Sequence, residues 1–260
     1  MDFDATGQGG SRNILSFIYK HYWTIGFRTR LYERFCPEAY CQSLRYLAEQ
    51  VRFKEGEATL DAGCGSGMLF SVLADRLKAG GGRYLGLDIL MSGLAALKLK
   101  ARQSILDGVV CPIQADLSRK LPFKNNSVFC IGAHFSLYTL RQEKDRQQAY
   151  REFYRILKPG GVLVTANPTS SYNAERIIRS SLHSLENVIP MYQWWIKKFL
   201  VYPLTLRLGL KHIERQIQCG RWHGYSAEEL QQEVRGAGFT IEHTDRVYAD
   251  SGFLVVGRKP

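Results

Sequence analysis

Between about residue 55 and residue 168, short apolar runs alternate with segments of helical character. The apolar runs read ATLDAG, RYLGLDI, VVCPIQADL, SVFCIGAHF and VLVTANP, and the helical segments between them include LAALKLKARQSI and DRQQAYREFYRILK. Strands that alternate with helices favour βαβ units, because parallel strands need a long crossover between them. The sequence therefore predicts an α/β fold whose mostly parallel sheet carries helices on both faces.

Two segments depart from this alternation. Residues 14–54 are rich in aromatic side chains and predict a helical head, and the polar residues 1–13 before them predict a disordered lead-in. Residues 169–222 predict a helical cap, inserted after the fifth strand. Residues 14–258 are thus expected to form a single domain.

After the cap, the chain returns to the sheet. Ser226 and Glu229 have the spacing of a capping box and predict the start of a helix. The runs FTIEHTDRVYA and GFLVVGRK then predict a closing antiparallel pair.

A glycine-rich turn follows the first expected strand, in the stretch LDAGCGSG. Gly63, Gly65 and Gly67 stand at every second position, behind Asp61. Such turns commonly bring backbone amides close to a nucleotide cofactor, but the dinucleotide pattern is G-x-G-x-x-G. A carboxylate at this place repels a pyrophosphate and attracts an ammonium group. The stretch therefore favours a cofactor with an ammonium group and no phosphate, such as S-adenosylmethionine (SAM).

Two further carboxylates stand where the next strands end. Asp88 closes the second strand, where an open α/β sheet commonly binds ribose hydroxyls, and Asp116 closes the third. Each alone could be a helix cap or a solvated loop residue. Three strand-end aspartates in this order after one glycine loop favour a shared binding site.

Several motifs together resemble one family. LDAGCGSG, GLDI, QADL, LPFKNNSVFCIGAHFSLYTL and EFYRILKPGGVLVTANP are similar to the successive motifs of class I SAM-dependent methyltransferases, in the small-molecule branch of quinone and natural-product methylases. The resemblance covers residues 55–168 and 224–258. It implies a seven-stranded Rossmann-like sheet and an enzyme that uses SAM and releases S-adenosylhomocysteine.

The resemblance also assigns cofactor contacts to particular positions. In the family, the glycine loop lies against the methionine part of SAM, and the aspartate before it lies near the ammonium. The end of the second strand binds the ribose and packs on the adenine. The end of the third strand meets the adenine edge, and the end of the fourth offers a backbone carbonyl to the ammonium. The matching positions here are Asp61, Gly63, Cys64, Gly65, Gly67, Asp88, Ile89, Asp116, Leu117, Ala133 and His134.

Methyl transfer from a sulfonium is an in-line displacement, so alignment of the reactants supplies most of the catalysis. A general base is needed only where the acceptor must lose a proton. His134 is one candidate base, and its alternative role is that of a satisfied histidine at the rim of the sheet. Tyr19, His21 and Tyr22 could close over the cofactor or simply pack on the sheet. Weaker candidates are His183, Tyr192, His223 and Tyr225.

The cap carries information about the acceptor. Ile178, Leu182, Leu185 and Ile189 fall on one helical face, and the following segment is dense in aromatic and aliphatic side chains. Residues 169–222 hold eight Lys or Arg against three Glu, a net charge of +5. An apolar, basic lid suits a hydrophobic acceptor or contact with a membrane surface. Packing onto the core, or contact between two copies in a homodimer, is the alternative.

The remaining composition leaves other functions open. The net charge of +11, from 35 basic and 24 acidic residues, allows nucleic acid, an anionic membrane or an acidic substrate as partner. We find neither a base-flipping motif nor an RNA-binding module, so nucleic acid is not expected. The six cysteines show no metal-ligand spacing, and no apolar run approaches about 18 residues, so we expect no metal and a cytoplasmic protein, monomeric or homodimeric. An RNA or protein methylase, and a SAM-binding protein recruited for a reaction such as cyclisation, remain alternative functions.

Overall fold

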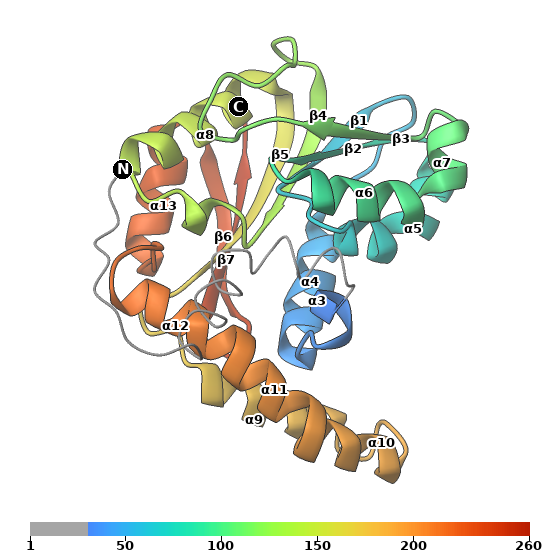
Figure 1. Cartoon of the computed structure of the whole chain (residues 1–260). Helices are drawn as coiled ribbons and strands as arrows, with labels where there is room; N and C mark the ends of the chain where they lie inside the picture. The colour runs from blue at the N-terminus through green and yellow to red at the C-terminus, as the bar shows by residue number, and fades with distance from the viewer. Residues whose placement is uncertain (1–30) are drawn as a thin grey trace, which may run out of the picture.

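The computed structural model describes residues 31–260, and a seven-stranded sheet forms its centre (Figure 1). The strand order is β3-β2-β1-β4-β5-β7-β6. The strands are β1 Ala58–Ala62, β2 Arg83–Asp88, β3 Val110–Gln114, β4 Val128–His134, β5 Leu157–Pro168, β6 Thr240–Val247 and β7 Gly252–Arg258. The first five are parallel, whereas β7 runs antiparallel to both β5 and β6. The expected mostly parallel sheet with a closing antiparallel pair is confirmed.

Helices cover both faces of this sheet. One face carries α4 Glu38–Gln50, α5 Met68–Gly80, α6 Met91–Lys100 and α7 Arg102–Leu106, and the other carries α8 Glu143–Ile156 and α13 Ala227–Gly236. Side chains of one strand alternate between the two layers: Cys130 packs with α4 and α5, whereas Ile131 packs with α8. This alternation buries two hydrophobic cores, one on each side of the sheet.

Two short sequence signals, the capping box at Ser226 and the Pro-Gly-Gly run at residues 159–161, can be compared with the structure. The Ser226 hydroxyl accepts a hydrogen bond from the Glu229 amide at 3.1 Å, so α13 begins with the expected cap. The run Pro159-Gly160-Gly161, which precedes the apolar run VLVTANP and marks a turn in the sequence, lies within β5. Leu157 pairs with Val128 and Val162 pairs with Cys130, so residues 158–161 bulge out of the ladder.

The cap between β5 and α13 is helical, as expected. It consists of α9 Ala174–Leu185, α10 Met191–Ile196, the π-helical turn η2 Lys197–Val201, α11 Tyr202–Thr205, the π-helical turn η3 Leu206–Leu210 and α12 Lys211–Gln218. Residues 174–210, here called the arm, project away from the sheet, with α10 at the far end (Figure 1). The buried side of α9 consists of Ala174, Ile177, Ser181 and Leu185. It is shifted by about one residue from the expected apolar face, because small residues allow α9 to pack closely on α4.

The base of the arm is hydrogen-bonded to the start of α4. The Ala39 amide donates to Ser181 Oγ at 3.0 Å, and the Glu38 amide donates to Tyr202 Oη at 3.3 Å. Thr205 Oγ1 donates to the Phe35 carbonyl at 2.8 Å, beyond the short helix α3 Leu31–Arg34. The head and the cap are therefore joined side by side, although about 140–170 residues separate them in sequence.

The expected disordered lead-in and three candidate site residues lie outside the described residues. They are residues 1–13, Tyr19, His21 and Tyr22. Their predicted roles stay predictions.

Candidate functional site

A cavity of about 350 Å³ opens at the carboxyl ends of the parallel strands. It is lined by most of the loop 63–68 after β1, by residues 88–90 and 115–117, and by residues 134–136, 139 and 140 at and after the end of β4. Between β1 and β4 the strand order reverses, which is where open α/β sheets bind ligands. Its volume lies within the range of small-molecule sites.

The glycines of the loop after β1 each adopt a backbone conformation that other residues rarely reach. Gly63, Gly65 and Gly67 have φ angles of 83°, 49° and 76°. A Cβ on Gly63 would lie 2.3 Å from that of Ser136, and one on Gly67 would lie 2.5 Å from a methyl group of Leu97. The glycines therefore serve the shape and packing of the loop, which leaves Gly63 and Gly65 on the cavity wall and Gly67 outside it.

Asp88 holds the glycine loop against the end of β2. One carboxylate oxygen accepts the Gly65 amide at 2.8 Å, and the other accepts the Leu90 amide at 2.8 Å. Burial raises the pKa of Asp88, and these backbone amides act against the rise. Because a carboxylate has about four lone-pair sites, Asp88 can still accept hydrogen bonds from a ligand in the cavity.

Asp61, the first residue of the sequence pattern, is buried and is not among the residues that line the cavity. Its carboxyl accepts a short hydrogen bond from the Tyr84 hydroxyl. Burial raises the pKa of Asp61 to about 7, and the negative charge of Asp88 adds to the rise. Asp61 thus lies behind the loop.

The adenine-side candidates reach the cavity. Asp116 Oδ1 accepts hydrogen bonds from the amide and hydroxyl of Ser118 at 2.9 and 2.7 Å. Leu117 and Ile89 line the same part of the wall, where Ile89 is 56% exposed. An exposed isoleucine at the edge of a cavity offers a flat apolar surface to a ligand.

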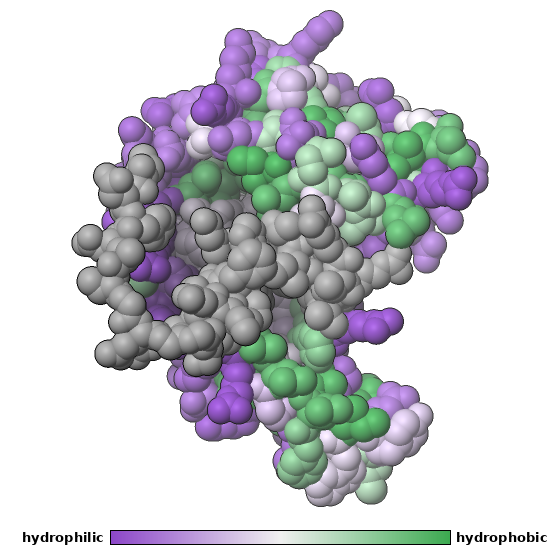
Figure 2. Space-filling model, viewed as in Figure 1, coloured by the Kyte–Doolittle hydropathy of each residue, from purple (hydrophilic) through white to green (hydrophobic). Residues whose placement is uncertain are grey.

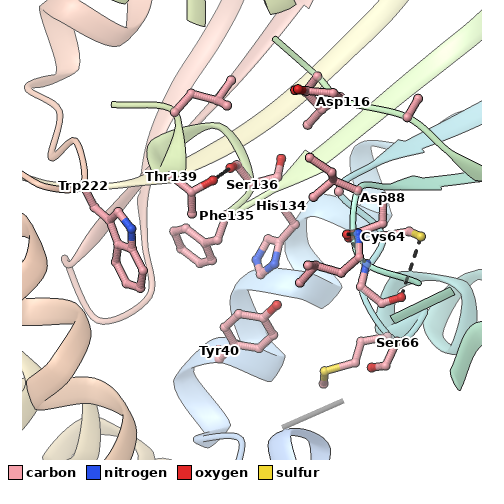
Figure 3. Close-up of a pocket in the computed structure, with 18 residues that line it drawn as sticks. Tyr40, Cys64, Ser66, Asp88, Asp116, His134, Phe135, Ser136, Thr139 and Trp222 are labelled. Atoms are coloured by element: carbon pink, nitrogen blue, oxygen red, sulfur yellow. Dashed lines mark hydrogen bonds between the residues drawn. The ribbon is translucent and has the colours of Figure 1, made fainter. Parts of the chain in front are cut away.

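His134 ends β4 and points into the cavity beside Phe135 and above Tyr40 (Figure 3). Its Nε2 lies 3.0 Å from the hydroxyl of Ser43, which donates its single hydrogen to the Tyr40 carbonyl at 2.9 Å. We therefore assign the Nε2–H tautomer, in which the Ser43 oxygen accepts from Nε2–H and the lone pair is on Nδ1. Nδ1 is buried and has no hydrogen-bond partner among the described residues. Burial lowers the pKa of His134 to about 3, so the ring is neutral at ordinary pH.

The structure adds cavity residues that the sequence patterns did not single out. Ser66 and Ser136 line the wall with buried hydroxyls that have no partner among the described residues. Tyr40 comes from α4 and Trp222 from the end of the cap, and both face the cavity (Figure 3). Aromatic density in the head and cap was a signal, but it did not single out these two residues.

The other candidates differ in their places. Ala133 is fully buried within β4 and does not line the cavity. Cys64 is among the residues that line it, and burial raises the pKa of its thiol well above the usual value. His183 and Tyr192 are exposed on the arm. The hydroxyl of Tyr225 is buried and donates to Glu233 at 3.0 Å.

One group of potential metal ligands occurs in residues 31–260. His223, Glu229 and Glu233 bring their ligand atoms within 4.8 Å of one another. Arg146 already neutralises Glu233, through contacts of 2.9 Å from Nε and 2.8 Å from a terminal nitrogen. A resident guanidinium disfavours a second cation at this place.

Comparison with known proteins identifies the family. Residues 60–165 match a family model described as a methyltransferase domain. The chain is 35% identical over 206 residues to the 2-phytyl-1,4-naphtoquinone methyltransferase of Nostoc punctiforme, which covers 79% of this chain and 82% of that protein. The chain belongs to the class I SAM-dependent methyltransferases.

Two further matches agree with this family. The demethylmenaquinone methyltransferase of Lactiplantibacillus plantarum is 29% identical over 200 residues, 76% of each chain. A SAM-dependent methyltransferase structure from Aquifex aeolicus shares the fold, with a TM-score of 0.56 and 16% identity over 90% of this chain and 98% of that one.

The cofactor of this methyltransferase is SAM, and the cavity fits it. Backbone amides and carboxylates gather at one end of the cavity, and buried serine hydroxyls without partners stand beside them. These groups supply the donors and acceptors that the amino acid and ribose parts of such a ligand would need. Among the described helices, we find none with both the length and the apolar character needed to cross a membrane.

Proposed function

We propose that this methyltransferase transfers the methyl group of SAM to a hydrophobic, hydroxyl-bearing ring compound of the quinol or phenol class. The observation that carries the proposal is the two-ended character of the cavity. Asp88, Asp116 and the glycine loop line one end, whereas Tyr40, Phe135 and Trp222 line the other (Figure 3). The named activities of both relatives, on a naphthoquinone and a demethylmenaquinone, support the same acceptor class.

The polar end is the proposed cofactor site. The loop glycines, Cys64 and Ser66 would lie along the amino acid part of SAM, and Asp88 would accept hydrogen bonds from the ribose. Ile89, Asp116 and Leu117 would hold the adenine. Asp61 would act from behind the loop, where its negative charge favours a nearby ammonium group.

The aromatic end is the proposed acceptor site, with His134 at the border between the two. When bound, SAM supplies an electrophilic methyl group on a positively charged sulfur. The acceptor ring would pack against the aromatic side chains, and its hydroxyl would donate a hydrogen bond to the free lone pair of His134 Nδ1. Because the pKa of His134 is about 3, we assign the ring the role of orienting the acceptor and not that of storing its proton.

Ser43 would act through His134 as a positioning residue. By accepting from Nε2–H, its hydroxyl fixes the tautomer that leaves Nδ1 free. Ser43→Ala should leave S-adenosylhomocysteine affinity unchanged and lower kcat for the methyl transfer. A loss of cofactor affinity in that variant would contradict this role.

The cofactor site is tested by calorimetric titration of S-adenosylhomocysteine, with NAD as the control ligand. Asp116→Ala should weaken binding about tenfold, as expected for a lost hydrogen bond to a carboxylate. Asp107→Ala is the control variant. Asp107 is exposed and precedes β3, the strand that Asp116 follows, so this change removes an equal charge without touching the cavity. Equal affinities in the two variants, or binding of NAD in place of S-adenosylhomocysteine, would contradict the assignment.

The acceptor class is tested with labelled SAM and three kinds of acceptor: reduced naphthoquinones, bulk RNA and a protein mixture. Label in the naphthoquinol, with a rate that falls in His134→Phe, is the expected result. Label in RNA or protein would instead establish the alternative methylase function. Consumption of the quinol without label, in a protein that binds S-adenosylhomocysteine, would favour a non-methylating reaction.

A further inference from the structure

The arm carries most of the strongly exposed large apolar side chains of the described chain. Fourteen large apolar side chains are strongly exposed, and nine of these lie between residues 188 and 208: Val188, Met191, Tyr192, Trp195, Ile196, Phe199, Leu200, Leu204 and Leu208. Figure 2 shows hydrophobic residues gathered along the arm, below the body of the molecule. A soluble surface rarely concentrates apolar side chains to this degree without a binding purpose.

The spacing of these residues forms a continuous stripe. Positions 192, 196, 200, 204 and 208 follow at steps of four along one helical stretch. In a pure α-helix such a row drifts round the axis, but η2 and η3 are π-helical and wind more residues into each turn. The two π-helical turns therefore keep the apolar row along one side of the arm.

The far end of the arm combines aromatic rings with basic groups. Trp195 stacks on Phe199 with ring centroids 4.9 Å apart, and Lys198 Nζ lies 4.6 Å from the centre of Trp194 and 5.5 Å from that of Trp195. The Trp194 indole N–H donates a hydrogen bond to the Leu182 carbonyl at 3.0 Å, so Trp194 faces α9. Trp195 is next to it in the helix and therefore faces a different way. Aromatic rings beside lysines are typical of segments that lie at the boundary between lipid headgroups and acyl chains.

The positive charge of the arm favours lipids with anionic headgroups. Residues 174–210 contain five basic side chains (Arg176, Arg179, Lys197, Lys198 and Arg207) and two acidic ones (Glu175 and Glu186), a net charge of +3. Such a surface is attracted to anionic headgroups by about 1 kcal/mol for each basic residue near the membrane.

We propose that the arm docks the protein on the surface of an anionic phospholipid bilayer, with the apolar stripe of α10, η2 and α11 inserted among the headgroups. The arm projects away from the sheet (Figure 1), so the arm can reach a flat surface that the sheet does not contact. Docking would hold the enzyme where apolar acceptors are concentrated. It does not depend on the proposed acceptor class, because it follows from the arm alone.

The test is co-sedimentation of the full chain with vesicles, without any acceptor present. Vesicles of phosphatidylcholine and phosphatidylglycerol in a two-to-one ratio should bind the protein, and pure phosphatidylcholine vesicles should bind it more weakly. Phe199→Ser should lower the partition coefficient about tenfold, because an inserted phenyl group is lost. Leu106→Ser is the matched control: Leu106 is 73% exposed on α7, away from the arm, and its replacement should change nothing.

A second pair of variants separates charge from apolar insertion. Lys198→Gln should lower binding to the anionic vesicles about fivefold and leave binding to phosphatidylcholine almost unchanged. Lys98→Gln, on the exposed side of α6, should have a much smaller effect on either vesicle. Unchanged S-adenosylhomocysteine affinity in all four variants would show that each is folded.

Three results would overturn the proposal. In the first, the wild type sediments with neither kind of vesicle. In the second, Phe199→Ser and Leu106→Ser bind equally well. In the third, sedimentation velocity shows a dimer that Phe199→Ser converts to a monomer, without vesicle binding, so that the stripe is an interface between two copies. None of these results bears on methyl transfer, which is measured separately.

Discussion

Gly93, in the first turn of α6, is expected to control cofactor affinity without belonging to the cavity wall. A Cβ built on Gly93 would lie 2.9 Å from the carbonyl oxygen of Gly65 and 3.0 Å from its carbonyl carbon. Both atoms belong to the backbone of the glycine loop, so no side chain can rotate away. In Gly93→Ala, either the loop or the start of α6 must therefore move.

The effects of this change on stability and on binding should differ in size. Alanine is favoured over glycine inside a helix by up to about 1 kcal/mol, whereas overpacking costs about 1–3 kcal/mol. The free energy of unfolding should thus fall by no more than about 2 kcal/mol. Movement of the loop would lengthen the 2.8 Å hydrogen bond from the Gly65 amide to Asp88, worth about 1.5–3 kcal/mol for a charged acceptor. We expect the Kd for S-adenosylhomocysteine to rise about 10- to 100-fold.

The assay combines calorimetric titration of S-adenosylhomocysteine with urea denaturation of the same samples. Gly236→Ala is the matched control, because Gly236 ends α13 and a Cβ there meets nothing within 4 Å. That variant should keep its affinity and be no less stable than the wild type. If Gly93→Ala also bound S-adenosylhomocysteine as tightly as the wild type, the contact between α6 and the loop would not set the shape of the site.

Three further predictions concern buried charges. The pKa of Asp61 is about 7 in the folded state against 3.8 when unfolded, so the contribution of Asp61 to the unfolding free energy should be lost as pH rises from about 4 to about 7; the difference in unfolding free energy between the wild type and Asp61→Asn, from urea denaturation, should change over this range. The contribution of His134 has the opposite sign, because its folded pKa of about 3 lies below 6.5: this contribution to stability should be lost as pH falls from about 6.5 to about 3, and thermal melts of His134→Gln should not show that part of the loss. Arg146→Met should cost about 3–5 kcal/mol, because it leaves Glu233 buried and unpaired, whereas Arg45→Met, at the exposed end of a surface pair, should cost less than about 1 kcal/mol in the same denaturation assay.

The sheet could be predicted from the sequence because its signals are local. The apolar runs lie within the strands, and the cap at Ser226 begins α13 as expected. The start of β5 was harder to predict, since Pro-Gly-Gly at residues 159–161 marks a departure from regular backbone but does not say whether the strand also pairs before it. Here β4 is long enough to pair on both sides of the bulge.

The polar half of the site followed from strand ends, but its internal contacts did not. That Asp88 holds the glycine loop, and that Asp61 faces Tyr84, depends on side-chain direction, which a spacing pattern does not contain. The aromatic half was harder still, because Tyr40 and Trp222 are separated by more than half of the chain. The hydrogen-bond partner of His134 Nε2 is Ser43, on a helix that precedes the first strand.

The hydrogen bonds between α4 and the arm have a consequence for building hybrid enzymes. Ser181, Tyr202 and Thr205 meet backbone groups of residues 35–39, so each partner leaves buried polar atoms unsatisfied when the other is replaced. α4 also carries Tyr40 into the cavity wall and places Ser43 against His134. A chimera that borrows the arm from a relative should therefore borrow α4 with it. The two segments are far apart in the gene but should be exchanged together. Grafting either one alone would remove one side of the hydrogen bonds that join them.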